Sequence, residues 1–242
     1  MKNNIVSLSG GKDSTAMLLM MLERKEPIHS VVFFDTGWEF PQIYDHILNL
    51  QSKIDIEIKI IQPNKKFNDL LKKWRWPAAN RRWCTGEKRD ALAKYSRTVE
   101  NAIEAVGYAY DERHRTSIKP RGKRIMRYPL IEYGVTEADA LQYCFDKGFN
   151  WGGVYDHLSR VSCFCCTLQT LSNLRNIRRF YPDQWQEMKN MGSKLTEHYG
   201  LNDSIPGFRG AKSIHDIDKR FYEEDRQLDL FPGMEEGEWT KS

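Results

Sequence analysis

The sequence lacks long apolar runs, a secretory signal and a disulfide framework. Its longest purely apolar run, residues 16–22, is far too short to cross a bilayer. The first residues lead directly into a strand-like run, without the apolar core or cleavage site of a signal peptide. Only five cysteines occur in 242 residues, and three of them lie within residues 163–166. Clustered thiols fit a reducing compartment and a metal or redox role, so we expect a cytoplasmic protein with no membrane partner.

Charges of one sign are scarce in two stretches. Residues 113–127 contain seven Lys or Arg residues and no acidic one, whereas residues 222–242 contain seven acidic and two basic residues. A basic stretch is usually a solvated face, and the alternative is a site for phosphate, sulfate or nucleic acid. The acidic stretch predicts a mobile tail.

Apolar runs typical of strands alternate with helical patterns before residue 130. We expect strands at residues 5–8, 30–34, 54–60 and 99–106, and helices at 14–24, 41–52, 67–73 and 85–94. Isoleucines alternate with mostly charged residues in 54–60, so this strand has one exposed face and lies near the sheet edge. The order predicts βαβ units in a doubly wound parallel α/β sheet of Rossmann type.

The pattern changes after residue 130. Thr136 and Asp139 predict a capped start of a helix over 136–147, residues 150–162 are rich in loops, and 171–191 are helical with a break at Pro182. We therefore expect an α/β domain over residues 1–130, a helical, cysteine-containing region over 131–221 packed on it, and an acidic tail over 222–242.

A glycine loop joins the first strand to the first helix. Gly10 and Gly11 let the backbone curl around an anion, and the helix start adds free N–H groups and partial positive charge. Lys12 adds a full charge, while the hydroxyls of Ser9 and Ser14 can donate hydrogen bonds to phosphate oxygens. The alternative is a plain strand-to-helix turn.

The loop differs from a Walker A loop. That motif needs a glycine at position 6, where this chain has Val6, and a Ser or Thr after the lysine, where it has Asp13. Walker loops serve enzymes that cleave a nucleotide at its terminal phosphate. The different loop of this chain therefore predicts cleavage at a different phosphate. Ligands of parallel sheets bind beyond the carboxyl ends of the strands, and residues 9–14, 35–38 and 107–115 all fall there.

Residues 9–14, Ser-Gly-Gly-Lys-Asp-Ser, resemble the PP-loop of the adenine nucleotide alpha-hydrolase superfamily. Over residues 4–190 the chain is similar to the phosphoadenosine phosphosulfate (PAPS) reductase family, because further motifs follow in order. These are Phe34-Asp35-Thr36-Gly37, Arg82-Trp83-Cys84-Thr85 with Lys88, Gly107 with Asp111, Glu112 and Arg115, Tyr128-Pro129-Leu130-Ile131, and Arg160-Val161-Ser162-Cys163 with Cys166.

The resemblance implies a sheet in the order 3-2-1-4-5 and an adenine nucleotide, either ATP with Mg²⁺ or PAPS or adenylyl sulfate. Lys12 and Ser14 would hold the leaving anion, with Arg113 or Arg115 stabilising charge from the opposite side. The full set of expected nucleotide-binding residues is Ser7, Ser9, Gly10, Gly11, Lys12, Asp13, Ser14, Phe34, Asp35, Thr36, Gly37, Asp111 and Arg113. The alternatives are a turn at residues 35–37 and a surface salt bridge of Asp111 and Glu112 with Arg115.

The cysteines form the second candidate centre. Cys163 and Cys166 have the CxxC spacing that lets two thiolates face one metal, and Cys165 and Cys84 bring the number of thiols to four. We interpret Cys144, within a helical pattern, as an ordinary buried cysteine. The set fits a 4Fe–4S cluster or zinc, and free thiols are the alternative. The family's reductases have a Cys-Cys pair first, where this chain has Cys84 alone.

The function expected from these features is ATP-dependent activation at the α-phosphate, coupled to sulfur-related or nucleic-acid-modifying chemistry with a sulfur donor. Family reductases use a nucleophilic cysteine on a C-terminal segment, whereas this sequence has no cysteine after Cys166. A true PAPS or adenylyl-sulfate reductase, served by a thioredoxin-like reductant, is the nearest alternative. A non-catalytic module that binds nucleotide or DNA is the third.

A short motif lies in the acidic stretch. Residues 227–231, Gln-Leu-Asp-Leu-Phe, resemble the peptide by which bacterial replication proteins bind the sliding clamp. The motif predicts a sliding-clamp partner and action near DNA, and the alternative is a tail that folds back onto its own domain.

Overall fold

The computed structural model describes residues 3–117, 124–200 and 207–230. The chain divides into two compact units, one made of Met1–Phe67 and Arg82–Phe164 and the other of Asn68–Arg81 and Cys165–Ser242. This division differs from the predicted boundary near residue 130. Among the described residues, no helix is long and apolar enough to span a membrane.

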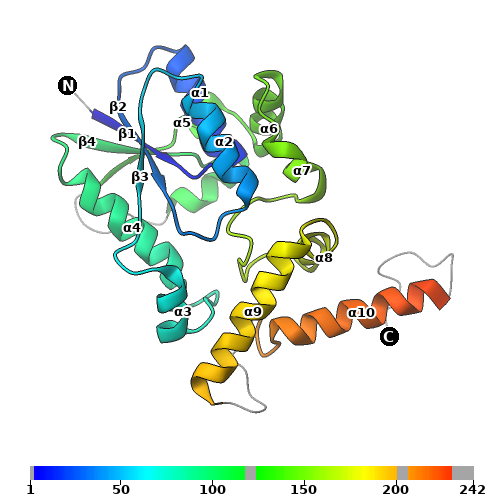
Figure 1. The fold of residues 1–242 in the computed structure, drawn as a ribbon. Helices are drawn as coiled ribbons and strands as arrows, with labels where there is room; N and C mark the ends of the chain where they lie inside the picture. Colours follow the sequence, from blue (N-terminus) through cyan, green and yellow to red (C-terminus); the bar gives the residue numbers. More distant parts are fainter. Residues whose placement is uncertain (1–2, 118–123, 201–206, 231–242) are drawn as a thin grey trace. The chain divides into compact units, whose positions relative to one another are not determined.

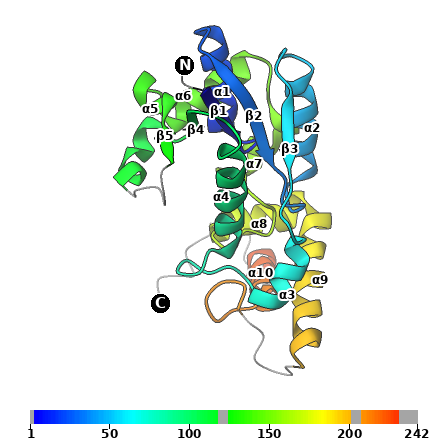
Figure 2. The same ribbon diagram turned by 90° about the vertical axis from the view of Figure 1, so that its left-hand side faces the viewer.

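The first unit is built on a parallel sheet of five strands in the order β3-β2-β1-β4-β5, which Figure 2 shows side by side. The strands are β1 (Asn3–Leu8), β2 (Ile28–Phe34), β3 (Ile58–Ile61), β4 (Ala102–Val106) and β5 (Ile125–Arg127). Every neighbouring pair is parallel. The doubly wound α/β class and the strand order expected from the family are therefore confirmed.

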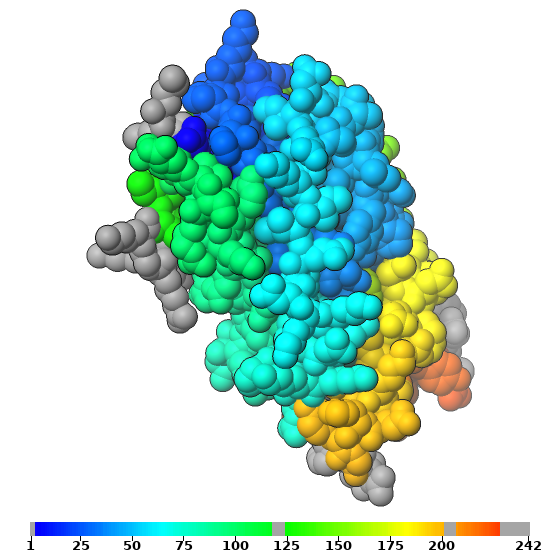
Figure 3. All heavy atoms as spheres, turned by 60° about the vertical axis from the view of Figure 1, so that its left-hand side comes forward, coloured from blue at the N-terminus to red at the C-terminus, as the bar shows by residue number. Residues whose placement is uncertain are grey.

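Helices cover both faces of the sheet. The helical elements of this unit are α1 (Lys12–Glu23), α2 (Pro41–Gln51), α4 (Trp83–Ser96), η1 (Tyr110–Ser117), α5 (Pro129–Tyr133), α6 (Glu137–Asp146), η2 (Trp151–Gly153) and α7 (Val154–His157). Figure 1 shows α1 and α2 along one face and α4 along the other, and Figure 3 looks towards the side that α4 covers. Crossovers between parallel strands are right-handed, so the reversal of strand order between β3 and β4 moves the helix to the other face.

The core of the sheet comes from apolar residues that the strand pattern predicted. Val6, Val31 and Val32 are fully buried, and Ala16, Met17 and Leu18 of α1 pack with no exposed surface. A helix this apolar has to be covered on its outer side as well, and α6 packs against α1 there.

Strand β3 is shorter than predicted. The strand was expected over residues 54–60, but only Ile58–Ile61 pair with β2. The amide of Gln51 accepts from Ile58 N at 2.6 Å and donates to Ile56 O at 3.2 Å, which keeps the preceding residues out of the ladder. The edge position is confirmed, and Ile60 on this edge is 59% exposed.

The second unit is helical. It contains most of α3 (Phe67–Trp74) together with α8 (Leu171–Phe180), α9 (Pro182–Tyr199) and α10 (Ile214–Leu230). Pro182 begins α9, which confirms the predicted break. Trp76 and Phe208 pack edge to face with ring centroids 4.9 Å apart, and both are buried.

Helix α10 contains residues that were expected in a mobile tail from residue 222. Ser213 and Asp216 cap its start reciprocally, and Phe221 is buried. Glu224 and Asp225 form ion pairs with Arg175, and Asp225 also pairs with Arg178 at the next turn of α8. These pairs and the buried ring stabilise the helix, so residues 222–230 are helical and not a free tail. Residues 231–242 lie outside the described part.

Candidate functional site

The glycine loop lies where the strand order reverses. Ser9, Gly10 and Gly11 connect β1 to α1, and the neighbouring strand on the side of the reversal is β4. This switch point is where ligands of open parallel sheets bind. Gly10 has a φ of 78°, and a Cβ there would lie 2.7 Å from Ile43 Cγ2, so only glycine fits.

Two serine hydroxyls hold the loop in its curled form. Ser14 Oγ accepts from Ser9 N at 3.0 Å and lies 2.9 Å from Ser9 Oγ. It also donates to Gly11 O at 3.1 Å. Ser14 is buried at the first turn of α1, whereas Ser9 is exposed. Both predicted hydroxyls are therefore at the loop, where they bond to each other.

The close contact between the end of β4 and the start of α1 depends on Gly107, the residue that follows β4. A Cβ at this position would lie 2.9 Å from Ser14 Cα and 3.0 Å from Ser14 N. Real Cβ atoms do not approach backbone so closely, so the missing side chain lets the end of β4 touch the start of α1. Gly107 was expected to matter only because it belongs to a motif of the similar family, and this close packing is its physical reason.

Lys12 is buried and lies between two carboxylates. Its Nζ is 2.6 Å from Glu137 Oε2 and 3.1 Å from Asp13 Oδ1. Burial alone would lower the pKa of Lys12, but Asp13 and Glu137 outweigh it and the pKa is raised. Burial raises the pKa of Asp13 to about 6, despite the lysine beside it. Glu137, on α6, was not predicted as a site residue.

The end of β2 lies beside the loop, because β1 and β2 pair in register up to Leu8 and Phe33. Asp35 accepts from Gly37 N at 2.8 Å and from the Tyr44 hydroxyl at 2.8 Å. Phe34 is buried, with its ring 6.2 Å from that of Phe67. The ring of Phe34 is therefore part of the core, and only its backbone is left to flank a nucleotide.

The arginines expected opposite the loop lie on η1, after β4. Arg115 is paired with Glu112, and its guanidinium lies 4.2 Å from the centroid of the Tyr108 ring. Arg113 lies over the Tyr110 ring at 4.7 Å. Asp111 accepts a hydrogen bond from Glu137 N at 3.2 Å, and this bond joins η1 to the start of α6. The Glu112–Arg115 ion pair was the structural alternative for this motif.

A second polar cluster follows β2. Thr36 donates to Glu39 Oε1 at 2.7 Å, and Cys163 Sγ lies 3.6 Å from Thr36 Oγ1. Burial raises the pKa of Glu39 and lowers that of Lys88, while Cys163 and Glu39 favour the charged form of the lysine. Sequence reasoning missed Glu39, although its partner Thr36 is only three residues away. Lys88 and Cys163 belong to the motifs that carried the family resemblance.

The cysteines are divided between the two units. Cys84, in the first turn of α4, and Cys163 belong to the first, whereas Cys165 and Cys166 belong to the second. Within residues 3–117, 124–200 and 207–230, no three His, Cys, Asp or Glu side chains gather closely enough to hold a metal ion. The ligand set therefore stays a prediction.

Cys144 is fully buried, as expected for an ordinary core cysteine. Burial raises the pKa of its thiol to about 12. The thiol donates to the carbonyl oxygen of Lys12 at 3.5 Å, so this residue also supports the glycine loop.

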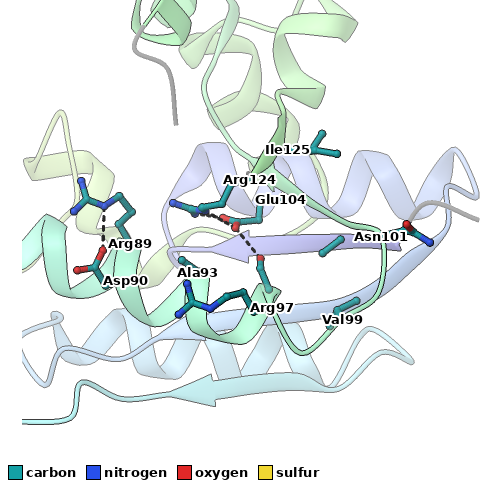
Figure 4. Close-up of a pocket in the computed structure, with 11 residues that line it drawn as sticks. Arg89, Asp90, Ala93, Arg97, Val99, Asn101, Glu104, Arg124 and Ile125 are labelled. Atoms are coloured by element: carbon teal, nitrogen blue, oxygen red, sulfur yellow. Dashed lines mark hydrogen bonds and ion pairs between the residues drawn. The ribbon is translucent and has the colours of Figure 1, made fainter. Parts of the chain in front are cut away.

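Besides Arg115, two further arginines of the basic stretch are neutralised by carboxylates. Arg124 pairs with the buried Glu104, and both residues line a cavity of about 580 Å³, which Figure 4 shows with the Arg124–Glu104 contact drawn. Arg127 pairs with Glu26 and Glu132. These residues stabilise the structure around β5, whereas residues 118–123 of the stretch lie outside the described residues.

The segment expected to be loop-rich contributes to the site. The indole of Trp151 donates to Gly10 O at 2.7 Å and stacks on His46 at 4.5 Å between ring centroids. His46 Nε2 lies 2.9 Å from the hydroxyl of Thr15 in α1. Burial lowers the pKa of His46 to about 4, so this ring is neutral at pH 7. No local pattern indicates these contacts, because they join residues far apart in the sequence.

The fold and the loop match known proteins. The model of the phosphoadenosine phosphosulfate reductase domain matches residues 3–169. A crystal structure of the phosphoadenylyl-sulfate reductase from Candida auris is 15% identical, with a TM-score of 0.51, over 67% of this chain and 82% of that one. The U34-tRNA thiolase NcsA from Methanococcus maripaludis, with its [4Fe-4S] cluster, is 16% identical over 96% of this chain and 75% of that one, with a TM-score of 0.49.

Curated relatives are longer than this chain. An uncharacterised protein of Methanocaldococcus jannaschii is 24% identical in an alignment 217 residues long, which covers 82% of this chain and 43% of the relative. The chain thus spans less than half the length of that relative. The match of the family model covers more than half of the chain and includes the glycine loop and the ends of β2 and β4. The chain therefore belongs to the phosphoadenosine phosphosulfate reductase domain family, a member of the PP-loop superfamily.

Proposed function

We propose that this chain is a PP-loop enzyme that binds an adenine nucleotide, with ATP favoured, and reacts at the α-phosphate. The observation that carries the proposal is the curled loop of residues 9–14 at the switch point, with buried Lys12 at its centre. The match of the family model over the same residues supports it. Acceptors in sulfur-related or nucleic-acid-modifying chemistry are the proposed substrates.

The proposed reaction is a displacement at the α-phosphorus. A nucleophilic oxygen of the acceptor forms a bond to the α-phosphorus, and the bond from this phosphorus to the bridging oxygen of the β-phosphate breaks. Adenylylated acceptor and pyrophosphate result, and the electron pair of the broken bond leaves on pyrophosphate. Lys12 and Ser14 bind this leaving group and stabilise its growing charge. Mg²⁺ enters with ATP as part of the substrate.

Lys12 needs to change partners for this role. In the structure Glu137 and Asp13 share its ammonium group. An incoming phosphate competes with both carboxylates, so the affinity for the anion depends on how readily they give way. Protonation of Asp13, whose pKa is about 6, favours the exchange.

Reduction of a sulfonucleotide is the second candidate. The description of the matched family, phosphoadenosine phosphosulfate reductase, favours it. The same loop would then bind the oxyanion of PAPS or adenylyl sulfate, and a thioredoxin-like protein or another thiol would supply electrons. Release of sulfite with a thiol reductant distinguishes this reaction from adenylylation.

We further propose a metal–thiolate centre on Cys84, Cys163, Cys165 and Cys166. Soft thiolates favour iron–sulfur clusters or zinc over magnesium and calcium. Anaerobic purification with an absorbance spectrum and metal analysis tests the set: an iron–sulfur spectrum or bound zinc is expected, and loss of the metal in Cys163→Ser.

Replacement of Lys12 tests the proposed function. Lys12→Met keeps most of the buried stem but removes the charge, so we expect the rate of pyrophosphate formation from ATP to fall about 100-fold. The products are separated chromatographically in the presence of candidate acceptors. Lys66→Met is the matched control, because Lys66 is exposed and outside the site. Formation of ADP and phosphate by the wild-type chain would contradict the proposal.

A further inference from the structure

A tyrosine from outside the glycine loop occupies one of the loop's backbone donors. Tyr155, on the short helix α7, accepts a hydrogen bond from Lys12 N at a distance of 2.8 Å. Its hydroxyl oxygen lies 3.3 Å from the position that a Cβ of Gly11 would take. The phenol group therefore sits directly at the start of α1.

The position of Tyr155 is fixed by the loop and its neighbours. Its ring packs edge to face on Trp151, with centroids 4.9 Å apart, and Trp151 is itself hydrogen-bonded to Gly10 O. Both aromatic residues thus contact consecutive parts of the loop. The absence of a side chain on Gly11 leaves room for the hydroxyl.

The hydroxyl group of Tyr155 still has a hydrogen that it can donate. A phenol group can accept one hydrogen bond and donate another, and Tyr155 already accepts from Lys12 N. Among the residues that the structure describes, none accepts a hydrogen bond from Tyr155. Burial raises the pKa of Tyr155, so the hydroxyl is protonated at neutral pH and remains a donor.

We propose that Tyr155 is part of the anion site and donates its hydroxyl hydrogen to an oxygen of the phosphate or sulfate group bound by the loop. The inference rests on the proposed function and names a further binding residue for it. The Lys12 N–H then acts through the tyrosine: it polarises the hydroxyl, and the hydroxyl contacts the oxyanion. The alternative is that Tyr155 only closes the loop and has to leave when an anion enters.

The two roles predict opposite effects of Tyr155→Phe. Removing the hydroxyl deletes a donor if the tyrosine contacts the anion, so pyrophosphate and ATP should bind about tenfold more weakly. If the tyrosine only closes the empty loop, the same change frees the N–H group of Lys12 for the anion, and the anion should bind equally well or more tightly. Phenylalanine keeps the ring against Trp151, and thermal unfolding checks that the fold is intact.

Isothermal titration calorimetry with pyrophosphate, ATP and adenosine as probes decides between these outcomes. We expect Tyr155→Phe to weaken pyrophosphate and ATP but to change adenosine binding less than twofold. Tyr222→Phe, an exposed tyrosine of the other unit, is the matched control. Equal or tighter binding of pyrophosphate to Tyr155→Phe would overturn the inference.

The experiment separates this inference from the proposed function. If the wild-type chain binds pyrophosphate but neither ATP nor adenosine, the adenine-nucleotide function fails while the role of Tyr155 can still be measured. If ATP binds and the two chains have the same affinity, only the inference fails. If no oxyanion binds to the wild-type chain, both are wrong.

Discussion

Asp13 is held where a carboxylate is unfavourable. It is buried next to Lys12, and Glu137 and Glu112 add like charge, so its pKa is raised from 3.8 to about 6. Buried carboxylates with a raised pKa beside a charged partner are found most often at functional sites. The same residue thus opposes folding and, in our proposal, controls access of the anion to Lys12.

Asp13→Asn should therefore stabilise the folded chain at neutral pH. Between pH 3.8 and about 6 the folded state binds more protons than the unfolded state, so the free energy of unfolding falls as the pH rises and stays lower above pH 6. Removing the charge should raise this free energy at pH 7.5 by up to about 3 kcal/mol. The gain should vanish below pH 4.

Urea unfolding at pH 7.5 and pH 3.5 measures both parts of this expectation. Asp55→Asn, at an exposed position, is the control and should change the free energy of unfolding by less than about 0.5 kcal/mol. A loss of stability in Asp13→Asn at pH 7.5 would show that the attraction to Lys12 outweighs the burial.

At the scale of elements, the close approach of β4 to α1 depends on one missing side chain. Gly107→Ala would place a Cβ about 3 Å from backbone atoms of Ser14 and Asp13. Backbone cannot move aside as the end of a flexible side chain can, so we expect a loss of about 1–3 kcal/mol in unfolding free energy. Anion binding should weaken as well, because the start of α1 is displaced.

Gly86→Ala is the matched substitution. Gly86 lies inside α4, and a Cβ there would meet no atom within 4 Å. Alanine in a helix interior is better than glycine by about 0.5–1 kcal/mol, so this variant should be slightly more stable. Thermal unfolding of the pair compares a glycine required by packing with one that is not. Equal stability of both variants would contradict the geometry at Gly107.

Elements with local signals could be predicted from the sequence, and contacts between distant segments could not. Thr136 and Asp139 form the capping box that their spacing predicts, because both partners lie within one helical turn. The residue that binds Lys12 from α6 is Glu137, 125 positions away. Only the folded sheet brings these residues together, so the pattern predicts the helix but not its contact with the loop.

The same distinction explains the error at residue 222. The acidic residues of α10 were predicted to form a mobile tail because their basic partners lie on another helix, far away in the sequence. Asp225 is bound by Arg175 and Arg178, which lie one helical turn apart on α8 and face the same side. The sliding-clamp motif begins in this helix at Gln227, and Phe231 lies outside the described residues, so that partner stays a prediction.

At the scale of the whole molecule, the chain passes between its two units three times. Residues 68–81 belong to the unit whose other part begins at Cys165. Their contacts within that unit are specific: Trp76 packs on Phe208, and Thr167 donates to Pro77 O at 2.8 Å. Removing one part of this unit therefore exposes the other.

A chain ending at Phe164 should aggregate, because Trp76, now 3% exposed, would lose Phe208 and its other partners. A second chain with the same end and a Gly/Ser linker of equal length in place of residues 68–81 should be more soluble. Size-exclusion chromatography and hydrogen exchange of the β1 amides compare the two. Equal solubility would show that residues 68–81 need no cover.

Residues 68–81 also set an order of events during synthesis. A ribosome releases this segment well before the residues from 165 onward that complete its unit. The sheet can add β4 and β5 before that point, while Trp76 still lacks the side chains that later cover it. The nascent chain thus carries an uncovered aromatic segment through much of its translation, and a chaperone that binds exposed tryptophan would find its target there.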